Sequence, residues 1–205
     1  MRKLLLTLPL LISATLPAQQ TNITGGVHAG LSAPFGDFAD KKDSYGYYLG
    51  ANEGLGLQVG GHVNFEFDRH QELRLHATVL GFASKEQDAY DGSYYGTAQN
   101  TFGIVQVGGD YLYHFTSPSR GGYLLGGLSL NQVKATYSFT GYPDYEVSQS
   151  GRLGFRVGGG YHFNRIFSLE GSLNNVSVDS NGTDGMGLNA ITWVSLDAVL
   201  RFGGR

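Results

Sequence analysis

The chain has 205 residues with a formal net charge of -3, no cysteine, 32 glycines, 13% aromatic residues and only 15% charged residues. A nucleic-acid-binding protein normally carries a clustered basic surface, so this charge excludes nucleic acid as an expected partner. The lack of cysteine excludes disulfide frameworks and cysteine-based zinc sites, and the length suits one all-β domain.

The first residues indicate export. Met1, Arg2 and Lys3 are followed by an apolar stretch over residues 4–16 and then by Pro17 and Ala18, which is the pattern of a secretory signal peptide. The apolar stretch is shorter than the ~20 residues that cross a bilayer as a helix. We therefore expect a cleaved signal peptide over residues 1–18 and one domain over 19–205. Any membrane span in that domain has to consist of strands.

From about Thr24 onward, apolar and polar residues alternate with a period of two, which is typical of strands with two different faces. In one such segment, Leu73, Leu75 and Val79 alternate with Arg74 and His76. The candidate strands are, in chain order, residues 27–33, 57–67, 73–79, 105–115, 124–130, 153–163, 167–173 and 194–202. We predict eight antiparallel strands.

The connections between these segments alternate in length. Short turns are expected near residues 69–70, 116–121 and 164–165. Long polar segments are expected at about 35–54, 85–100, 138–150 and 179–190. This rhythm predicts an up-and-down transmembrane β-barrel with periplasmic turns and external loops.

Aromatic residues gather on the apolar face, where the strands adjoin the short turns or the C-terminus. Core packing would scatter these residues along the strands, whereas a membrane interface places them in a ring at one depth. The predicted interface aromatics are Phe65, Phe67, Tyr113, Phe115, Tyr161, Phe163, Phe167 and Phe202.

Charged residues occupy the opposite face, which should line the lumen because a charge facing lipid is costly. The predicted structural charge network consists of Glu66, Arg74, Asp110, Arg156, Glu170, Asp197 and Arg201. The interior of an eight-stranded barrel is filled by side chains, and buried charges need partners. We expect Glu66 to pair with Arg74 and Glu170 with Arg201.

The segment Gly158–Glu170 resembles the glycine-rich strand, tight turn and returning strand of small eight-stranded outer-membrane barrels of the OmpA, OmpX and OmpW type, often grouped as porin-family proteins of the Gram-negative cell envelope. Residues Val194–Phe202 resemble the last strand of that family. The resemblance implies that the barrel-assembly machinery recognises this strand with Phe202 as its aromatic end, although the chain continues through Gly203, Gly204 and Arg205.

Three long segments are rich in tyrosine, over residues 43–48, 88–95 and 142–145, and such residues suit adaptable contact surfaces. We therefore expect an integral outer-membrane protein in contact with outer-membrane lipid. Its expected role is structural or one of surface interaction through its loops, with an extracellular ligand as the candidate partner of the tyrosine-rich loops. The alternatives are a channel for small or apolar solutes, as an OmpW-like resemblance implies, a lipid-modifying barrel enzyme, or a soluble periplasmic ligand-binding barrel.

Five histidines are expected in the lumen, at positions 28, 62, 76, 114 and 162. They form no recognisable catalytic motif, and we expect no catalytic residue, cofactor or metal.

Overall fold

The computed structural model describes residues 22–42, 47–90, 95–181 and 185–203, so the predicted signal peptide lies outside the described residues. The elements are β1 (Asn22–Pro34), α2 (Asp37–Asp40), β2 (Gly56–Glu66), β3 (Gln71–Ala83), β4 (Gln87–Tyr90), β5 (Tyr95–His114), β6 (Gly121–Phe139), β7 (Tyr145–His162), β8 (Phe167–Ser177) and β9 (Ala190–Gly203).

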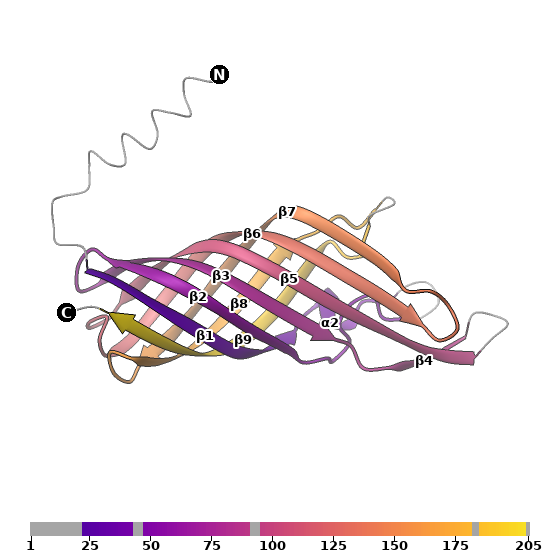
Figure 1. Ribbon diagram of the computed structural model, residues 1–205, viewed down its shortest axis with the longest axis horizontal. Helices are drawn as coiled ribbons and strands as arrows, with labels where there is room; N and C mark the ends of the chain where they lie inside the picture. The colour runs from indigo at the N-terminus through magenta and orange to yellow at the C-terminus, as the bar shows by residue number, and fades with distance from the viewer. Residues whose placement is uncertain (1–21, 43–46, 91–94, 182–184, 204–205) are drawn as a thin grey trace, which may run out of the picture.

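Eight of these strands form a closed antiparallel barrel (Figure 1). The sheet runs in the order β3-β2-β1-β9-β8-β7-β6-β5-β4, and pairing of β3 with β5 closes the ring. β4 pairs with residues 95–98 of β5, beyond the part of β5 that pairs with β3, and adds no strand to the ring. The predicted eight-stranded up-and-down barrel is confirmed. The start of β1, the end of β9 and the three short turns lie at one end of the barrel, which we call the turn end, and the opposite end is the loop end.

The two faces of the wall differ as the alternation predicts. In β3, Leu75 and Val79 are 49% and 56% exposed on the outer surface, whereas Arg74 and His76 are buried in the lumen. The same arrangement recurs around the ring, because side chains two residues apart lie on the same face of a strand. The half of the barrel next to the turn end, which we call the turn half, therefore has an apolar outside and a polar inside.

Three strands are much longer than a membrane span requires. β5, β6 and β7 have 20, 19 and 18 residues, whereas ~9–11 residues suffice to cross a bilayer. Two predicted loops are consequently wrong. Residues 85–100 contain β4 and the first residues of β5, and residues 138–150 contain the end of β6 and the start of β7.

A β-bulge explains why the alternation hid part of β7. Asn131 pairs with Arg152 but Val133 pairs with Gln149, so the two residues Ser150 and Gly151 face the single residue between the β6 partners. Along β7 the extra residue shifts the inward positions from odd numbers, as at Val147 and Gln149, to even numbers, as at Gly154 and Arg156. A pattern of strict period two ends at this shift, although the strand continues.

Beyond the bulge the wall reverses its polarity. On β6, the outward residues Leu128 and Leu130 are followed by the exposed polar residues Gln132 and Lys134. The inward residues change in the opposite sense, from Asn131 to Val133 and Ala135. The half of the barrel next to the loop end, which we call the loop half, therefore has a polar outside and an apolar inside, like a water-soluble barrel.

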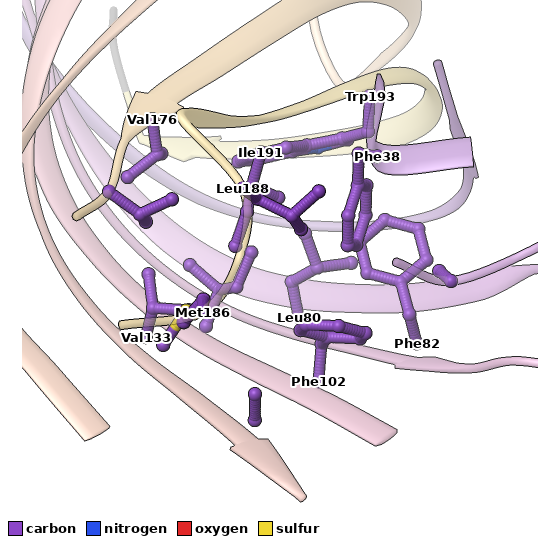
Figure 2. Packing of buried hydrophobic residues seen from close by; sticks show 14 of the residues in the cluster. Phe38, Leu80, Phe82, Phe102, Val133, Val176, Met186, Leu188, Ile191 and Trp193 are labelled. Atoms are coloured by element: carbon purple, nitrogen blue, oxygen red, sulfur yellow. The ribbon is translucent and has the colours of Figure 1, made fainter. Parts of the chain in front are cut away.

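An apolar plug fills the loop half of the lumen (Figure 2). Its buried residues are Phe38, Ala51, Leu80, Phe82, Phe102, Ile104, Val133, Ala135, Val147, Val176, Val178, Met186, Leu188, Ile191 and Trp193. Some come from the barrel strands, while α2 and the β1–β2 and β8–β9 connections fold inward to supply the rest.

Phe38 of α2 is fully buried in this plug. Its ring meets those of Phe82 and Phe102 edge to face, with centroids 5.1 and 5.0 Å apart. The N–H of Ala51 donates to the Phe38 carbonyl at 2.8 Å, and a Cβ on Gly50 would lie only 2.0 Å from that carbonyl oxygen. Glycine at position 50 thus lets the connection pack closely on α2. Within the described residues, no helix is long and apolar enough to span a membrane.

Candidate functional site

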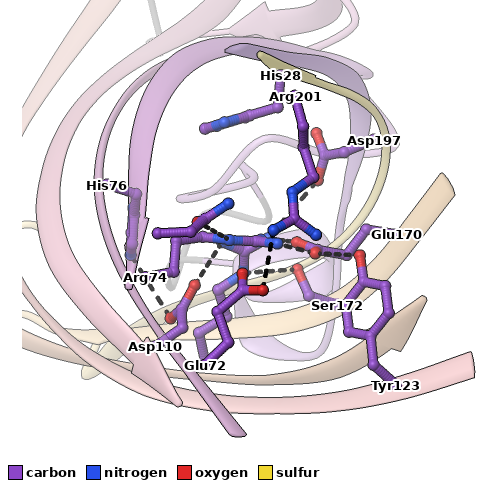
Figure 3. A network of polar contacts seen from close by, with 12 residues as sticks. His28, Glu72, Arg74, His76, Asp110, Tyr123, Glu170, Ser172, Asp197 and Arg201 are labelled. Atoms are coloured by element: carbon purple, nitrogen blue, oxygen red, sulfur yellow. Dashed lines mark hydrogen bonds and ion pairs between the residues drawn. The ribbon is translucent and has the colours of Figure 1, made fainter. Parts of the chain in front are cut away.

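A network of buried charges fills the turn half of the lumen, and Glu170 of β8 is its centre (Figure 3). Arg74 of β3 donates to Glu170 at 2.7 Å, and the Tyr123 hydroxyl of β6 donates to the same carboxylate oxygen at 2.7 Å. Arg156 of β7 pairs with the other oxygen. Side chains from three strands therefore converge on one carboxylate of a fourth strand, which is 1% exposed.

Arg156 links this centre to two further carboxylates. Its guanidinium lies 3.2 Å from Asp110 and 3.9 Å from Asp197. Asp197 also accepts hydrogen bonds from Gln58 at 2.5 Å and from the Ser195 hydroxyl at 3.2 Å. Each of these buried charges thus has polar partners, which is the condition under which a protein interior tolerates charge.

Arg201 forms a second centre near the turn end. It donates to Glu66 and Glu72 at 2.9 Å each, and to the Thr24 hydroxyl at 3.2 Å. It also donates to the carbonyl of Pro118 in the β5–β6 turn at 3.0 Å. This one side chain ties four separate parts of the chain together.

All seven charged residues expected in the network point into the lumen, but the two specific pairs were wrong. Glu66 pairs with Arg201, and Glu170 pairs with Arg74. Register explains the exchange. Glu66 lies opposite Glu72, while Arg74 lies opposite Asn64 and Asp110. In both of these pairs the arginine side chain reaches across the lumen to a strand that is not its neighbour in the sheet.

Sequence reasoning missed Glu72 and Tyr123. Glu72 is fully buried and belongs to the same alternation as Arg74 and His76, so extending that pattern by two residues would have found it. Alternation also places Tyr123 on the inner face, next to the outward Leu124, but an uncharged tyrosine gave no indication that it joins an ion-pair network.

The five predicted lumen histidines are buried inside the barrel. His114 lies 3.2 Å from Glu72, and His76 lies 3.6 Å from Asp110. His162 stacks on Tyr123 with ring centroids 4.4 Å apart. Among the described residues, no group of three His, Cys, Asp or Glu side chains is placed to hold a metal ion. The arrangement fills and braces the lumen.

The predicted interface aromatics lie on the outer surface near the turn end. Phe115, Phe163 and Phe202 are each more than half exposed. Neighbouring rings contact one another, with centroids 5.3 Å apart for Tyr161 and Phe163 and 5.6 Å apart for Phe163 and Phe167. Phe65 and Phe67 are half-buried. Their role at a membrane interface stays a prediction.

At the loop end, above the plug, the inner face of β5–β7 lines a pocket of about 270 Å³. Its lining residues are Tyr47, Tyr48, Leu49, Gln87, Ala98, Asn100, Tyr137, Ser138, Phe139, Pro143 and Tyr145. A second pocket of about 230 Å³ shares Leu49, Tyr137 and Tyr145 with it. Two of the predicted tyrosine-rich segments, 43–48 and 142–145, contribute to this lining, while residues 43–46 lie outside the described part.

Among the described residues, neither pocket has a charged side chain in its lining, and the Lys42 ammonium lies 4.3 Å from the centroid of the Tyr48 ring. Lys85 pairs with Glu53 at 2.6 Å, and this hydrogen bond lowers the pKa of Glu53. Burial raises the pKa of Tyr137, which lies beyond the apolar part of β6, to about 12. The Tyr137 hydroxyl donates to the Met186 carbonyl at 3.3 Å. The described lining of both pockets therefore consists of uncharged residues.

A closed antiparallel barrel with an apolar outer belt and a charged, filled lumen has the fold of the small outer-membrane β-barrels. Among solved structures, the chain is similar to Ail, the attachment invasion locus protein of Yersinia pestis, in complex with the heparin analogue sucrose octasulfate. The two share 14% identity at a TM-score of 0.55, over 88% of this chain and 99% of that one.

Two further similar structures are those of Neisserial surface protein A and of the N-terminal β-barrel domain of Pseudomonas aeruginosa OprF. For the first, the TM-score is 0.49 at 15% identity, over 88% of this chain and 96% of that one. For the second, it is 0.45 at 15% identity, over 89% and 100%. No protein-family model and no curated protein sequence matches the chain.

Proposed function

We propose that the protein is an integral outer-membrane barrel that does not conduct and that presents its loop end to partners outside the cell. The observation that carries this proposal is the belt of exposed apolar side chains around the turn half. Belt residues include Val27, Leu31, Val59, Val63, Leu75, Val79, Val105, Val107, Leu128, Leu130, Leu153, Phe155, Val157, Val194, Leu196 and Leu200. Soluble monomers rarely expose so large a continuous apolar surface.

The dimensions of the belt suit a bilayer. On β5 its outward residues run from Val105 to Tyr113, and on β7 from Leu153 to Tyr161, which is nine residues in each strand. A tilted transmembrane strand needs ~9–11 residues. The polar outer surface beyond the belt supports a loop half that projects into water, with the turn end in the periplasm.

A channel is the weaker candidate because the lumen is filled twice. The charge network around Glu170 and Arg201 fills the turn half, and the apolar plug, which includes Phe38 and Trp193, fills the loop half. A soluble ligand-binding barrel is also disfavoured, since it would place the apolar face of the turn half inside and the charges outside.

An enzymatic role finds no support in the contacts of the lumen. The Nε2 atom of His28 lies 3.0 Å from the Thr78 hydroxyl. Nucleophilic catalysis also needs a group that orients the base and space for a substrate. Both residues are instead buried inside the filled lumen.

The charge of the loop end argues against a polysulfated ligand of the kind bound in the Ail complex. In the connections and outer strand segments of that end, the described acidic residues are Asp37, Asp40, Glu53, Glu86, Asp88, Asp144, Glu146 and Asp179, and the basic ones are Lys41, Lys42, Lys85, Lys134 and Arg152. An excess of acidic groups repels a polyanion.

The proposal includes two steps of biogenesis. A signal peptide over residues 1–18 would direct export. The barrel-assembly machinery would recognise β9, on which Phe202 is 55% exposed on the apolar face.

Fractionation of expressing cells tests the proposal directly. We expect the protein in the outer-membrane fraction, gel migration that changes on boiling, and no single-channel conductance after insertion into planar bilayers. A soluble protein that migrates identically with and without boiling would overturn the membrane assignment. Discrete conductance steps would overturn the closed lumen and favour the channel.

A further inference from the structure

The exposed charges at the two ends of the barrel differ in sign. Each of the three short turns at the turn end carries one exposed arginine (Figure 1): Arg69 between β2 and β3, Arg120 between β5 and β6, and Arg165 between β7 and β8. We call these three residues the turn arginines. Within these fully described turns, Asp68 is the one acidic residue. The turns therefore present a net positive surface where the barrel wall ends, whereas the described residues of the loop end have an excess of acidic groups.

Two of the turns share one local structure that leaves the arginine side chain unused. Asp68 and Asn164 each precede a turn arginine, and the side-chain oxygen of each accepts the N–H groups two and three positions further on. The distances are 2.6 and 2.8 Å for Asp68 and 2.8 Å twice for Asn164. Short polar side chains commonly close turns in this way. Arg69 and Arg165 thus stand at the tips of turns that other groups close.

The third turn is also closed without its arginine side chain. The Thr116 hydroxyl donates to the backbone carbonyl of Arg120 at 2.8 Å. The carbonyl of Pro118 in the same turn accepts a hydrogen bond from Arg201 of the lumen network at 3.0 Å. The turn is therefore fixed to the lumen by Arg201, while Arg120 contributes only its backbone.

The acidic groups of the turn end already have donors. Asp68 accepts the two N–H groups of its own turn. Glu66 lies beside Arg165 in a pocket of about 180 Å³ at the mouth of the lumen, and it accepts from Arg201 at 2.9 Å and from Asn22 at 2.8 Å. Among the described residues, no ion pair or hydrogen bond engages the guanidinium groups of the turn arginines. Three cationic groups are therefore available to an anion from outside the protein.

The turn arginines lie at the depth of lipid headgroups. Arg165 is two residues from both Phe163 and Phe167, whose rings are 51% and 37% exposed on the outer surface. Two residues of extended chain span at most ~7 Å, and the polar layer outside the hydrocarbon core is ~5–7 Å thick on each side. Arg69 likewise follows Phe67 by two residues. If the aromatic rings mark the edge of the hydrocarbon, the guanidinium groups reach the level of the phosphates.

The chemistry of the guanidinium group selects the headgroup. Guanidinium binds a phosphate through two parallel hydrogen bonds, and its long apolar stem lets the charge extend from an apolar surface into water. Cationic residues close to a membrane surface attract anionic lipids. A zwitterionic headgroup also has a phosphate, but its ammonium is repelled by a positive surface. An anionic headgroup such as phosphatidylglycerol has no such opposing charge.

From this arrangement we infer that the turn end binds the phosphate groups of anionic phospholipids in the periplasmic leaflet, with the turn arginines as the binding residues. The inference rests on the proposed function, which places the turn end at the periplasmic surface of the membrane. Peptidoglycan, an acidic cell-wall polymer, is the competing partner. It is disfavoured because the turns are too short to project beyond the headgroup layer.

Spin-labelled lipids test the inference. The refolded barrel is reconstituted into phosphatidylcholine vesicles, and electron paramagnetic resonance measures how much spin-labelled phosphatidylglycerol or phosphatidylcholine is immobilised at the protein surface. We expect phosphatidylglycerol to associate about threefold more strongly on average over both leaflets, and high salt to remove most of this preference. Equal association of the two lipids at low salt would overturn the inference.

Variants locate the binding residues. The triple variant Arg69→Gln, Arg120→Gln and Arg165→Gln should lose the preference for phosphatidylglycerol. Lysine at all three positions should retain most of it, because the charge remains. The matched control removes the same charge from exposed residues of the loop end: Lys42→Gln, Lys85→Gln and Lys134→Gln. Equal loss in the control, or a preference that survives in the glutamine variant, would contradict the assignment.

Two further measurements separate the lipid from the alternatives. Cosedimentation with purified peptidoglycan sacculi tests the competing partner. Sacculus binding that the glutamine variant loses, together with an unchanged lipid preference, would overturn the inference in favour of the cell wall. Heat-modifiable migration is measured on the same samples. A heat-modifiable barrel without a lipid preference would disprove the lipid site alone, whereas a sample without that behaviour would count against the membrane protein itself.

Discussion

At the residue scale, the inner lumen has to accommodate more carboxylates than guanidinium groups. The buried or half-buried acids are Glu66, Glu72, Asp110, Glu170 and Asp197, and the arginines are Arg74, Arg156 and Arg201. Two of the carboxylates also have a histidine as neighbour. Such a network stabilises the fold only while its members are present together, because each buried charge depends on its partners.

Replacing the central carboxylate should therefore be strongly destabilising. Glu170→Gln leaves Arg74 and Arg156 without their shared partner, and breaking a buried ion pair from one side costs ~3–5 kcal/mol. Urea unfolding of the refolded barrel, followed by gel migration, measures the change. Glu146→Gln is the control, since its ion pair with Lys134 is more than half exposed and should contribute no more than ~1 kcal/mol. Equal stability of both variants would show that the lumen network is not what holds the strands together.

The composition of this network could be predicted from the sequence, but its pairing could not. Alternation assigns Arg74 and Glu170 to the inner face, since the period of two is a local property of each strand. Which acid meets which base depends on the stagger of strands around the closed ring and on the reach of each side chain across it. Neither property is local to any segment.

At the element scale, β7 owes its continuity to one residue in an unusual backbone conformation. Gly151 has φ of 69° at the bulge, a region that residues with a Cβ adopt only at a cost. The bulge lets the same strand present Arg156 to the polar lumen and Val147 to the apolar plug.

Substituting this glycine should therefore weaken the loop half. Gly151→Ala should cost ~1–2 kcal/mol from backbone strain alone, because a Cβ there meets nothing within 4 Å. Gly103→Ala in β5 is the matched control. A Cβ at Gly103 also meets nothing within 4 Å and its φ is not positive, so no loss of stability is expected. Thermal unfolding of both variants measures the difference. Equal midpoints would show that the positive φ at Gly151 is not important for stability.

The inserted element α2 should matter more than its four residues suggest. Phe38→Ala removes a fully buried ring that packs against Phe82 and Phe102 and should cost ~3–5 kcal/mol. Phe35→Ala, at a position 57% exposed just before the helix, should change stability little. Loss of near-ultraviolet circular dichroism from the buried Trp193, which packs on Phe82, is expected for the first variant only. A Phe38→Ala barrel as stable as the wild type would show that the plug folds without α2.

The plug was beyond what the sequence alone reveals. Phe38 and Leu188 lie in segments that read as polar connections, and no periodic pattern marks them as core residues. Their burial follows from long-range contacts between connections that are distant along the chain. The turn-half strands were predictable because they follow one period on one face throughout.

At the scale of the whole molecule, one barrel wall consists of two halves with opposite polarity. The turn half is apolar outside and charged inside, while the loop half is polar outside and apolar inside, and the change falls near Leu130 on β6 and Leu153 on β7. The turn half buries charged side chains, which are unfavourable in lipid, and the loop half buries apolar side chains, which are unfavourable in water. The level of the change should therefore mark the outer boundary of the membrane.

A pair of arginine substitutions on one strand tests this boundary. Val157 is 50% exposed within the belt of β7, and Ser148 is exposed on the same strand beyond it. Val157→Arg places a charge in lipid, where it should cost ~2–4 kcal/mol near the midplane, whereas Ser148→Arg places one in water and should cost almost nothing. The stabilities are compared in lipid vesicles by urea unfolding. If both positions faced water, as in a soluble barrel, the two variants would be equally stable. A large penalty at Ser148 as well would instead place the loop half inside the bilayer and move the boundary outward.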